Sequence, residues 1–386
     1  MIQQVPYGLS PSVDITIANV AVDYTSINRL ELHLAENQHD LLILDMSGIP
    51  PKAITEYYEK PVYLKISTGG NFSQEFYGYV EDVRPNSFTG FGLMNGSPFQ
   101  EAKIICMGAS YVMRGTTSRV WNSYKLSDIA KEMCQKYGFS LDVISDPAIH
   151  ESLLQTNESD WQFLTRYAKF LGYSVNVHGS HMHVYDPYKA LSRQNSYHVL
   201  STIRKKVGAS LTPTPGQILE FSGSFSKRHV DGEYKESTVT IVNPDHSMFD
   251  VSSRTVAPNH NGVARFPDRV PEYVDNFEEA FRRISSVAKE DYDYYATSRV
   301  LGVAGCVPGG IVSLDNYNAD FDGFWYVRGV KHIVHTNAFS SELELAKNFN
   351  SELRFTNTEA AQRPPKPIYS NRQGWVSTTK RIYEYS

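Results

Sequence analysis

The sequence predicts an α+β fold that is mainly β. Short runs that alternate apolar and polar residues fill the first third of the chain and return in its last third. Between them, residues 125–187 show two helical patterns. The 25 Tyr and 19 Phe among 386 residues favour strands and interfaces. A chain of this length has room for about two to four domains.

The first β-region covers residues 12–115. Leu30, Leu32 and Leu34 point to one face of a strand, and the polar residues between them point to the other, as in a half-buried antiparallel sheet. Glycine and proline separate the strands, and a small barrel or sandwich is the expected closure. Strands are predicted at Val13–Val20, Leu30–Ala35, Asp40–Met46, Pro61–Ser67, Glu75–Val83 and Ala102–Met113.

The first helix of the middle stretch is expected to begin near Ser127 and to end at Gly138. Ser127 is the predicted N-cap, and Asp128 follows in the first turn, where a carboxylate favours the helix dipole. One face should be buried, because an apolar stripe recurs at helical spacing. The stripe consists of Ile129, Ala130, Met133 and Tyr137.

The second helix is expected between Asn157 and Gly172. Asn157 is the predicted N-cap, and Asp160 takes the capping-box position. Apolar residues again recur at helical spacing, so this helix should also bury one face. They are Trp161, Leu164, Ala168 and Leu171.

A β-hairpin is predicted directly after this helix. Tyr173–Val177 and Met182–Tyr185 alternate about Gly179-Ser180, a two-residue turn that suits type II′. The middle stretch therefore reads as one compact αβ unit.

Three histidines of the hairpin are candidate metal ligands. Cross-strand pairing puts His178, His181 and His183 on one face, where three imidazoles could bind zinc or nickel. However, Asn176 rather than a carboxylate should oppose His183, and a polar hairpin face needs no metal to be stable. We therefore predict no metal site.

The second β-region begins after the turn-rich segment Thr212–Gly216. An insertion rich in Pro, Asn, Asp and His, Asp245–Glu272, interrupts it and precedes a helix. Asp275 and Glu278 fit a capping box for that helix, whose apolar residues are Phe277, Phe281, Ile284 and Ala288. Strands are predicted at Gln217–Phe225, Ser237–Val242, Gly305–Leu314, Gly323–Val330 and Phe339–Ala346.

The last residues, Glu359–Ser386, are Pro-rich and cannot form a core by themselves. Two interpretations stay open, a disordered end and a strap that docks elsewhere. Trp375, Tyr383 and Tyr385 favour docking, because aromatic side chains are enriched at interfaces.

Charge and cysteine content narrow the function. The net charge of -5 disfavours sequence-specific DNA binding, which needs a basic surface to neutralise phosphates. Cys106, Cys134 and Cys306 lie far apart without a C-x-x-C pair, so we expect buried free thiols. We expect neither a signal peptide nor membrane insertion, because no run approaches about 18 apolar residues.

Common catalytic motifs do not occur in the sequence. No G-x-S-x-G is present, and His150-Glu151 does not continue to a second histidine of H-E-x-x-H. Asp291 and Asp293 read as a solvated helix face. His332 and His335 read as strand-face residues without a catalytic role. We therefore predict a protein that is not an enzyme, with no catalytic residues and no cofactor.

One resemblance gives these patterns a meaning. Leu126-x-x-Ile-Ala, Asn157-Glu-Ser-Asp-Trp-x-Phe-Leu and Leu171-Gly-Tyr, followed by a short hairpin, resemble the middle of phage tail baseplate hub proteins. That family includes late control protein D and the N-terminal part of VgrG in type VI secretion. An internal similarity agrees with it, because Tyr79-Val80-x-x-Val83 is repeated as Tyr326-Val327-x-x-Val330.

The resemblance implies two similar antiparallel β-barrel tube domains with inserted αβ domains. On this sequence the first barrel would be residues 1–115, followed by an αβ insertion at 116–207. The second barrel would be 208–245 with 298–350, with a loop-helix insertion at 246–297 and an extended C-terminal arm at 351–386.

The resemblance also implies a structural role in a virion tail baseplate, assembled in the host bacterial cytoplasm. Three copies of a two-barrel chain would present six barrels to a six-fold tail tube. The expected partners are the chain itself as a homotrimer, a tail tube or distal tail protein and a central spike or tail-tip protein. A tape measure protein and the baseplate wedge are further expected partners. A channel for DNA would pass through the trimer, with few unpaired basic residues along it.

A second function stays open at this point. Leu126–Leu141 also resembles a LysM repeat, so the chain could be a tail-associated protein that binds or degrades the cell wall. One LysM-like unit is a poor glycan binder, and no candidate acid has a supporting motif. The structural hub is therefore the preferred hypothesis.

Overall fold

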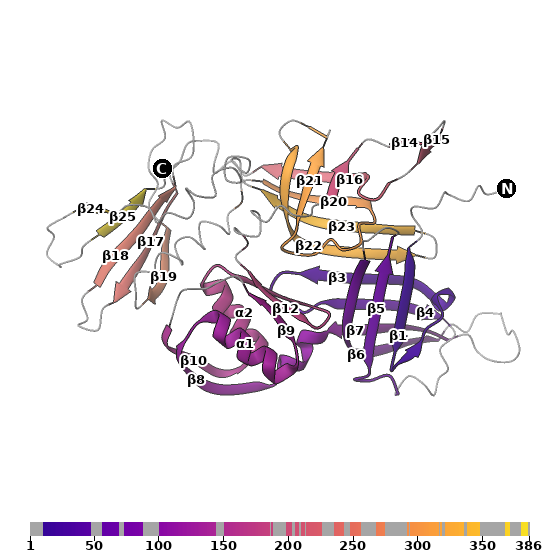
Figure 1. Cartoon of the computed structure of the whole chain (residues 1–386), viewed down its shortest axis with the longest axis horizontal. Coiled ribbons are helices and arrows are strands. Elements are labelled where there is room, and N and C mark those ends of the chain that lie inside the picture. The colour runs from indigo at the N-terminus through magenta and orange to yellow at the C-terminus, as the bar shows by residue number, and fades with distance from the viewer. Residues whose placement is uncertain are drawn as a thin grey trace, which may run out of the picture.

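A computed structural model of the chain describes most of it, and strands dominate the described part (Figure 1). Among the described residues, no helix is long and apolar enough to cross a membrane. The described residues are 11–47, 56–68, 73–87, 100–143, 150–185, 187, 198–202, 205–207, 210–212, 214–225, 235–242, 248–255, 268–274, 292, 294–315, 317–318, 321–335, 338–347, 367–370 and 380–384.

A 13-stranded sheet contains strands of both β-regions. Its main path is β16-β20-β23-β22-β3-β4-β7-β6-β5-β1-β2, and β21 pairs with β22 and β13. The N-terminal strands are β1 (Ser12–Ile17), β2 (Val20–Ala21), β3 (Ile27–Ala35), β4 (Leu41–Ser47), β5 (Pro61–Ser67), β6 (Ser73–Ser87) and β7 (Gln100–Gly108). The C-terminal strands are β13 (His198–Ser201), β16 (Ile218–Phe225), β20 (Tyr294–Leu301), β21 (Ile311–Asp315), β22 (Gly323–His335) and β23 (Ala338–Lys347).

The alternation seen in the sequence decides which face of this sheet is buried. Leu30, Leu32 and Leu34 are at most 1% exposed and belong to the core of the N-terminal strands. Trp325 and Val327 belong to the core of the C-terminal strands. The two cores are separate clusters, but β3 and β22 are hydrogen-bonded neighbours, so one sheet joins them. The predicted α+β, mainly β fold is confirmed.

The large sheet repeats one five-stranded unit. In the first unit, the strands β3, β4, β5, β6 and β7 follow each other along the chain and pair in the order β3-β4-β7-β6-β5. In the second unit, β16 is followed by β20, β21, β22 and β23 once β17–β19, which belong to another sheet, are left out, and these strands pair in the order β16-β20-β23-β22-β21. The first, second, third, fourth and fifth strands therefore correspond one to one.

Irregularities of the two units fall at equivalent positions. An extra residue interrupts the first strand of each unit, Asn28 in β3 and Leu219 in β16. Another interrupts the fourth strand, Glu81 in β6 and Arg328 in β22. These last two follow the Tyr-Val pairs that are similar in sequence. Because a bulge fixes the register around it, the two units align residue by residue.

The turn before the third strand is repeated as well. The backbone is left-handed at Glu59 (φ 58°) and at Gly309 (φ 87°). The residue after each of them accepts a hydrogen bond from the fourth strand, since Val80 N–H donates to Lys60 O and Val327 N–H donates to Gly310 O, both at 3.0 Å. The sequences of the two turns differ, but their backbones are alike.

An αβ unit lies between the two five-stranded units in the chain. Its helices α1 (Leu126–Tyr137) and α2 (Asp160–Phe170) pack between the antiparallel strand pair β8–β10 and a three-stranded sheet, β11-β12-β9 (Figure 1). The remaining elements are the 3₁₀-helix η3 (Ala109–Arg114), β8 (Thr116–Tyr124), β9 (Ser140–Val143), β10 (His150–Ser159), β11 (Ser174–His178) and β12 (His181–Tyr185).

Both predicted helices exist, but both predicted N-caps are wrong. α1 begins two residues earlier than expected, with Lys125 as its N-cap, and the Lys125 N–H donates to Asp128 Oδ2 at 3.4 Å. α2 is capped by Ser159, whose Oγ accepts from Gln162 N–H, while Gln162 Oε1 accepts from Ser159 N–H. This reciprocal pair is a capping box two residues after the predicted one, because the bulge at the end of β10 lengthens that strand.

The C-terminal signals of the two helices were predicted correctly. Gly138 and Gly172 both have a left-handed backbone, with φ of 77° and 74°. The hairpin that follows is confirmed, since β11 and β12 pair antiparallel about Gly179 and Ser180.

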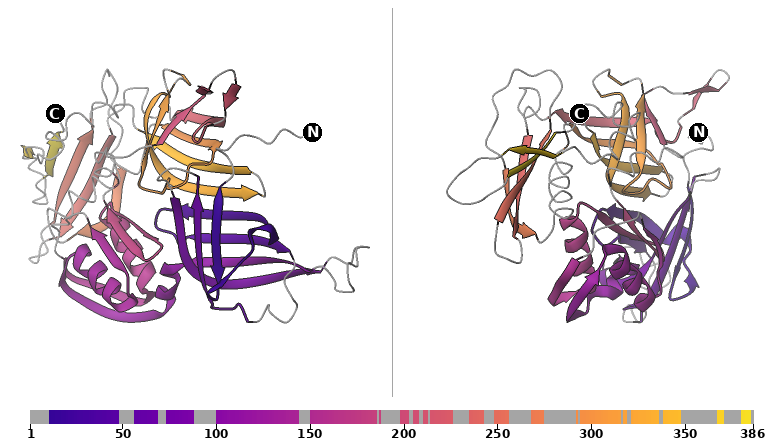
Figure 2. Two further views of the ribbon diagram at one scale, coloured as in Figure 1. Left: turned by 45° about the vertical axis from the view of Figure 1, so that its right-hand side comes forward. Right: turned by 60° about the vertical axis from the view of Figure 1, so that its left-hand side comes forward.

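A separate five-stranded sheet has the order β19-β17-β18-β25-β24 and lies apart from the large sheet (Figure 2). Ser237–Val242, which we expected in the second barrel, pairs here as part of β17. The C-terminal residues add two strands to this sheet, and β25 is parallel to β18. The predicted helix at residues 275–288 lies outside the described residues. The strands are β17 (Lys235–Val242), β18 (Met248–Thr255), β19 (Asp268–Val274), β24 (Pro367–Ser370) and β25 (Lys380–Glu384), and a small hairpin joins β14 (Lys205–Val207) to β15 (Ser210–Thr212).

Candidate functional site

The loop between β3 and β4, residues 36–40, joins three parts of the molecule. Glu36 accepts a hydrogen bond from Tyr185 Oη of β12 at 3.0 Å and another from Tyr326 Oη of β22. Asn37 N–H donates to Val175 O at 3.1 Å, and Val175 N–H donates to Asn37 Oδ1 at 2.9 Å. One short loop of the first unit therefore holds both the αβ unit and the second unit.

Two more residues of the same loop are bound to the αβ unit. His39 Nδ1 lies 2.7 Å from Ser110 Oγ, and its ring stacks on Trp161 with 5.0 Å between ring centroids. Asp40 Oδ2 lies 3.0 Å from His178 Nδ1, and Asp40 is 2% exposed. Burial lowers the pKa of His39 to about 4 and raises the pKa of Asp40. Burial favours the uncharged form of each side chain, and for Asp40 the neighbouring His178 partly offsets this effect on the pKa.

Sequence analysis did not identify this loop as a joint. In the sequence, the loop is the run Glu36-Asn-Gln-His-Asp40 between two strongly alternating strands. This run is typical of an ordinary polar turn. Burial of its carboxylates depends on residues more than a hundred positions away, Tyr185, Tyr326 and His178. No local pattern predicts such contacts.

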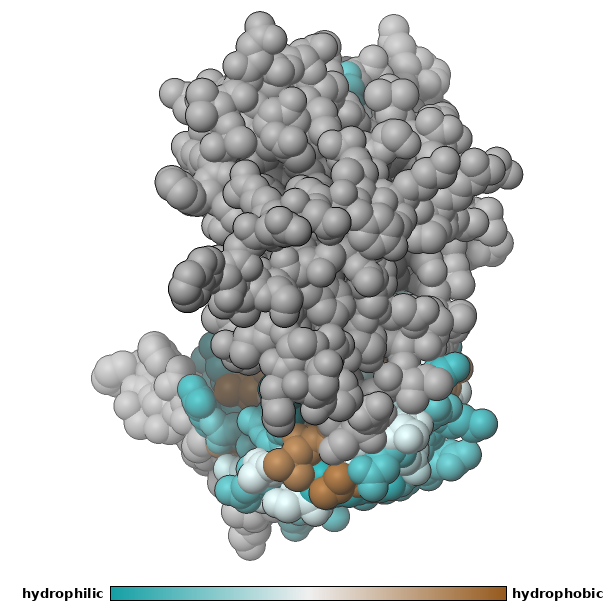
Figure 3. Space-filling model, turned by 90° about the vertical axis from the view of Figure 1, so that its left-hand side faces the viewer, coloured by the Kyte–Doolittle hydropathy of each residue, from teal (hydrophilic) through white to brown (hydrophobic). Residues whose placement is uncertain are grey.

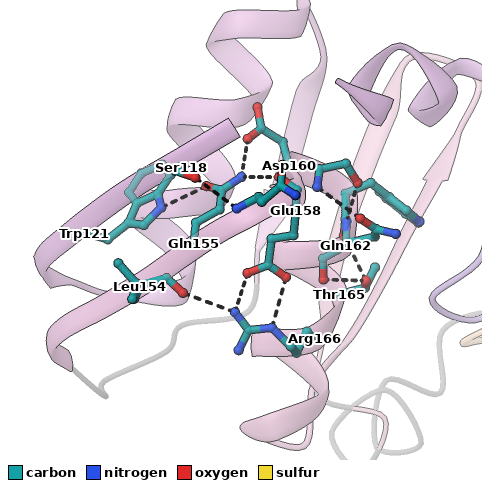
Figure 4. A network of polar contacts seen from close by, with 12 residues as sticks. Ser118, Trp121, Leu154, Gln155, Glu158, Asp160, Gln162, Thr165 and Arg166 are labelled. Carbon is teal, nitrogen blue, oxygen red and sulfur yellow. Dashed lines mark hydrogen bonds and ion pairs between the residues drawn. The ribbon is translucent and has the colours of Figure 1, made fainter. Parts of the chain in front are cut away.

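The motif that carried the family resemblance ties the αβ unit together (Figure 4). Gln155 is completely buried and donates to Asp160 Oδ1 at 2.8 Å, while its Oε1 accepts from Trp121 Nε1 at 3.2 Å. Asp160 Oδ2 also accepts from Lys136 Nζ at 2.6 Å and from Tyr137 Oη at 2.7 Å. Asp160 therefore connects the start of α2 to the end of α1, instead of serving in a capping box.

The neighbours of Asp160 in the motif have structural partners too. Arg166 clamps Glu158 through two hydrogen bonds, of 3.1 and 2.6 Å, and also donates to Leu154 O at 3.4 Å (Figure 4). Asn157 N–H donates to Ser118 Oγ at 3.0 Å. Hydrogen bonds and burial account for the polar residues of this motif, so it requires no catalytic explanation.

The outer side of the αβ unit is mostly hydrophilic. In Figure 3, hydrophobic residues occupy small areas among hydrophilic ones on the described part of this face. Val120 and Leu154 are exposed and lie opposite each other on β8 and β10. One face of the LysM-like segment packs inside this unit, because Ile129 and Met133 of α1 are buried and β9 pairs with β12.

The hairpin histidines lie on one face, as predicted. His178 and His181 are cross-strand partners, and the ring of His183 is 6.1 Å from that of His178 and 6.5 Å from that of His181. Asn176 opposes His183 on β11, as predicted, but the expected absence of a carboxylate is wrong, because β9 places Asp142 opposite His183 on the other side.

Each of these histidines has its own polar neighbour. His178 is bound to Asp40, His181 lies against Ser140, and His183 Nδ1 lies 3.7 Å from Asp142 Oδ2. Among the described residues, no group of three or more metal-binding side chains is arranged to hold an ion. That no metal binds the full chain stays a prediction.

His332 and His335 lie on opposite faces of β22. His332 is fully buried with Nδ1 at 2.9 Å from Ser341 Oγ, and burial lowers its pKa to about 4. His335 is exposed, and its carbonyl accepts from Tyr24 Oη at 3.1 Å. Cys106, Cys134 and Cys306 are free and buried, and burial raises the pKa of each thiol to about 12.

The face of the large sheet opposite the two cores, called the polar face below, carries several ion pairs, although Ile43, Ile105 and Ile333 also lie on it. Lys331 of β22 lies 3.2 Å from Glu31 of β3 and 4.0 Å from Glu342 of β23. Lys103 of β7 lies 3.7 Å from Asp45 of β4. Arg29 pairs with Glu31 and Arg84 pairs with Asp82 on the same face, and Arg299 lies between Glu220 and Glu342 in the strand register.

Comparison with protein families identifies the chain. The profile of the phage tail baseplate hub (GPD) family matches residues 39–338, which include the polar loop from His39, the αβ unit and most of the large sheet. The chain belongs to the phage tail baseplate hub (GPD) family. The resemblance inferred from sequence is thus confirmed, and members of this family are structural proteins of virion tails. None of the curated protein sequences matches the chain significantly.

Solved structures agree with this hub fold. A tail protein from Neisseria meningitidis MC58 is 14% identical with a TM-score of 0.63, and the match covers 88% of the hub chain and 97% of that protein. The 43 kDa tail protein of prophage MuSo2 from Shewanella oneidensis is 13% identical with a TM-score of 0.57, covering 89% and 99%.

A third similar structure comes from a secretion system. It is an Escherichia coli component of the type VI secretion system, described as similar to the T4 bacteriophage tail proteins gp27 and gp5. It is 10% identical with a TM-score of 0.52, covering 88% of the hub chain and 75% of that protein. At these identities the three likenesses establish the shared fold.

Proposed function

We propose that this hub protein is the trimeric adaptor between a six-fold tail tube and a three-fold spike or tail tip. Its role is structural, without catalysis. Three chains present six copies of the five-stranded unit to the tube, and one three-fold platform to the spike. The chain itself, a tail tube or distal tail protein and a central spike or tail-tip protein are the partners, with the tape measure protein and baseplate wedge nearby. Assembly takes place in the host bacterial cytoplasm.

The repeat of the five-stranded unit carries this proposal. Strand order, both bulges and the left-handed turn recur in the two units. A chain with two equivalent surfaces meets a ring of six equivalent subunits when three chains surround one axis. In this assignment residues 1–115 and the strands β16 and β20–β23 face the tube, and the αβ unit lies outside.

The polar face of the large sheet supports a channel for DNA. A free cationic side chain would bind each passing phosphate, and many such contacts would hold the DNA by counterion release. Lys331, Lys103, Arg84 and Arg29 instead each have a carboxylate within ion-pair distance. With this face toward the axis, the channel carries paired charges and lets DNA pass.

The molar mass of the assembly tests the proposal. Light scattering on the purified chain, alone and with its tube ring, should give three copies per particle. A stable dimer that yields no trimer beside the tube ring contradicts the proposal. Retention of the chain on peptidoglycan, with release of soluble fragments, would instead favour the cell-wall function.

A further inference from the structure

The two repeated units of one chain are joined by a single antiparallel ladder. Residues 329–335 of β22 pair with residues 29–35 of β3, and Val330 lies opposite Leu34. β22 is the fourth strand of its unit and β3 is the first strand of its unit. The join therefore places a fourth strand, beyond its bulge, beside a first strand.

The equivalents of these two segments are free edges in the described structure. β6 pairs with β5 as far as Tyr79, and residues 82–87 beyond its bulge pair with β7 on one side. β16 pairs with β20 on one side, and a bridge from Ser201 to Gln217 lies just before it. Within the described residues, no strand occupies the second side of either segment.

We propose that residues 82–87 of one copy pair with β16 of the next copy, in the register of β22 with β3. This inference rests on the proposed trimer and names the surface that closes it. The bulges Glu81 and Asn28, aligned with Arg328 and Leu219, fix the register. The aligned positions are Val83 opposite Phe225 and Arg84 opposite Ser224.

Side-chain character agrees with this register. Val83 is 5% exposed and belongs to the core, as does Val330 at the equivalent position. On β16, Phe221 packs against the second core, and the strand register puts position 225, the partner of Val83, in the same alternate series as Phe221. Arg84 and Ser224 are both exposed and fall on the polar face. In this register the core side of residues 82–87 in one copy continues into the core side of β16 in the next copy, and their polar faces are also continuous.

One residue makes this edge weaker than the ladder inside the chain. Pro85 has no N–H, and its equivalent in β22 is His332. The ladder between copies therefore lacks one donor, and proline on an edge strand also discourages pairing with unrelated strands. The remaining pairs form when the whole ring can close, because each chain is then held at both edges.

Engineered disulfides test the register in the full chain. Arg84→Cys with Ser224→Cys places two thiols at opposite positions, about 4.5–5.5 Å apart at Cα, within the range that a disulfide spans. Arg84→Cys with Ser222→Cys is the matched control, because the diagonal distance of about 7–8 Å is too long. Lys331→Cys with His33→Cys is the positive control, because it forms the same pair inside one chain.

The expected result is covalent dimers and trimers of R84C/S224C on a non-reducing gel, at least about tenfold more than of the R84C/S222C control. The native thiols are buried and do not compete. A trimer by light scattering that does not cross-link, or that cross-links equally in both variants, overturns the edge pairing and leaves the proposed function standing. Absence of any trimer beside the tube ring contradicts both.

Discussion

At the scale of single residues, buried polar side chains connect the parts of this hub. Asp160 is 4% exposed and accepts hydrogen bonds from Lys136 and Tyr137 at the end of α1 and from Gln155 of β10. Glu36 connects β3 to β12 and β22 in the same way. A buried carboxylate without partners is costly, so such contacts specify one arrangement of the parts. The conspicuous polar residues of the family motif thus serve the architecture.

Burial of His332 predicts an acid-sensitive fold. Its pKa falls to about 4, while an unfolded histidine keeps a pKa of about 6.5, so the unfolded state binds more protons between these values. Stability should therefore fall as the pH drops from about 6.5 to 4, by at most about 3 kcal/mol from this residue. Urea unfolding of wild type and His332→Gln at pH 7 and pH 5 measures the difference.

A nearby histidine supplies the control for this measurement. His335 is exposed on the same strand, so His335→Gln should keep the wild-type loss between pH 7 and pH 5. Burial also lowers the pKa of His39 to about 4, so His39 contributes the same acid-induced loss of stability in both variants. An equal loss in wild type and His332→Gln contradicts the prediction.

Removal of the three hairpin histidines should leave the proposed trimer intact. Replacing His178, His181 and His183 by alanine removes no contact to β16 or to residues 82–87. It does leave Asp40 buried without its partner, which should cost about 3 kcal/mol of unfolding free energy. Light scattering measures the assembly, and urea unfolding measures the loss.

Two further measurements decide between this structural role and a metal site. Adding Asp40→Asn to the triple variant should recover most of the lost stability, because an amide is less costly to bury than a carboxylate. Metal analysis of wild type should find less than one ion per chain. Stoichiometric metal that disappears in the triple variant shows that the face is a metal site.

At the scale of elements, periodicity predicted where strands and helices lie, but not how their ends are built. The alternation of Leu30, Leu32 and Leu34 identified β3 and its buried face. Asn157 looked like an N-cap because its side chain suits that position, yet its backbone is left-handed, with φ of 48°, within the irregular end of β10. Which of several adjacent polar residues caps a helix depends on where the preceding strand stops pairing.

Capping of α2 gives a prediction with a matched control. Ser159→Ala should lower the unfolding free energy by about 1 kcal/mol, because Gln162 N–H loses its acceptor. Ser127→Ala, at the position that sequence alone favoured for α1, should change it by less than about 0.5 kcal/mol, because Ser127 lies inside the helix. Thermal or urea unfolding compares the two. An equal loss of unfolding free energy in the two variants would show that the Ser159 cap does not stabilise α2.

The repeated turn predicts opposite effects at equivalent positions. Glu59→Gly should stabilise the chain by up to about 1 kcal/mol, because glycine adopts a positive φ without strain and the exposed contact to Arg114 is weak. Gly309→Ala should destabilise it by more than about 1 kcal/mol, because a Cβ there would lie 2.7 Å from the ring of Tyr185. Stabilisation by both changes would contradict the equivalence of the two turns.

At the scale of the whole molecule, the sequence showed a trace of the repeat and the family, but not the continuity of the sheet. Three matched positions in β6 and β22 were visible in sequence, because Tyr-Val and the following valine occur in both. The pairing of β3 with β22 depends on contacts between residues about three hundred positions apart. Neither strand's own pattern specifies its neighbour, so only the structure reveals the two free edges.

The assembled hub should not retain DNA at physiological salt. If the polar sheet face lines the channel, its lysines and arginines are neutralised by Glu31, Asp45, Asp82 and Glu342, so few counterions are released when DNA enters. A gel-shift assay with duplex DNA and the trimer should show no retained complex. Asp45→Asn combined with Glu31→Gln and Glu342→Gln, which removes the carboxylates paired with Lys103, Lys331 and Arg29, should introduce binding that weakens as salt is raised. Tight, salt-sensitive binding by the unaltered trimer would contradict a channel through which DNA passes.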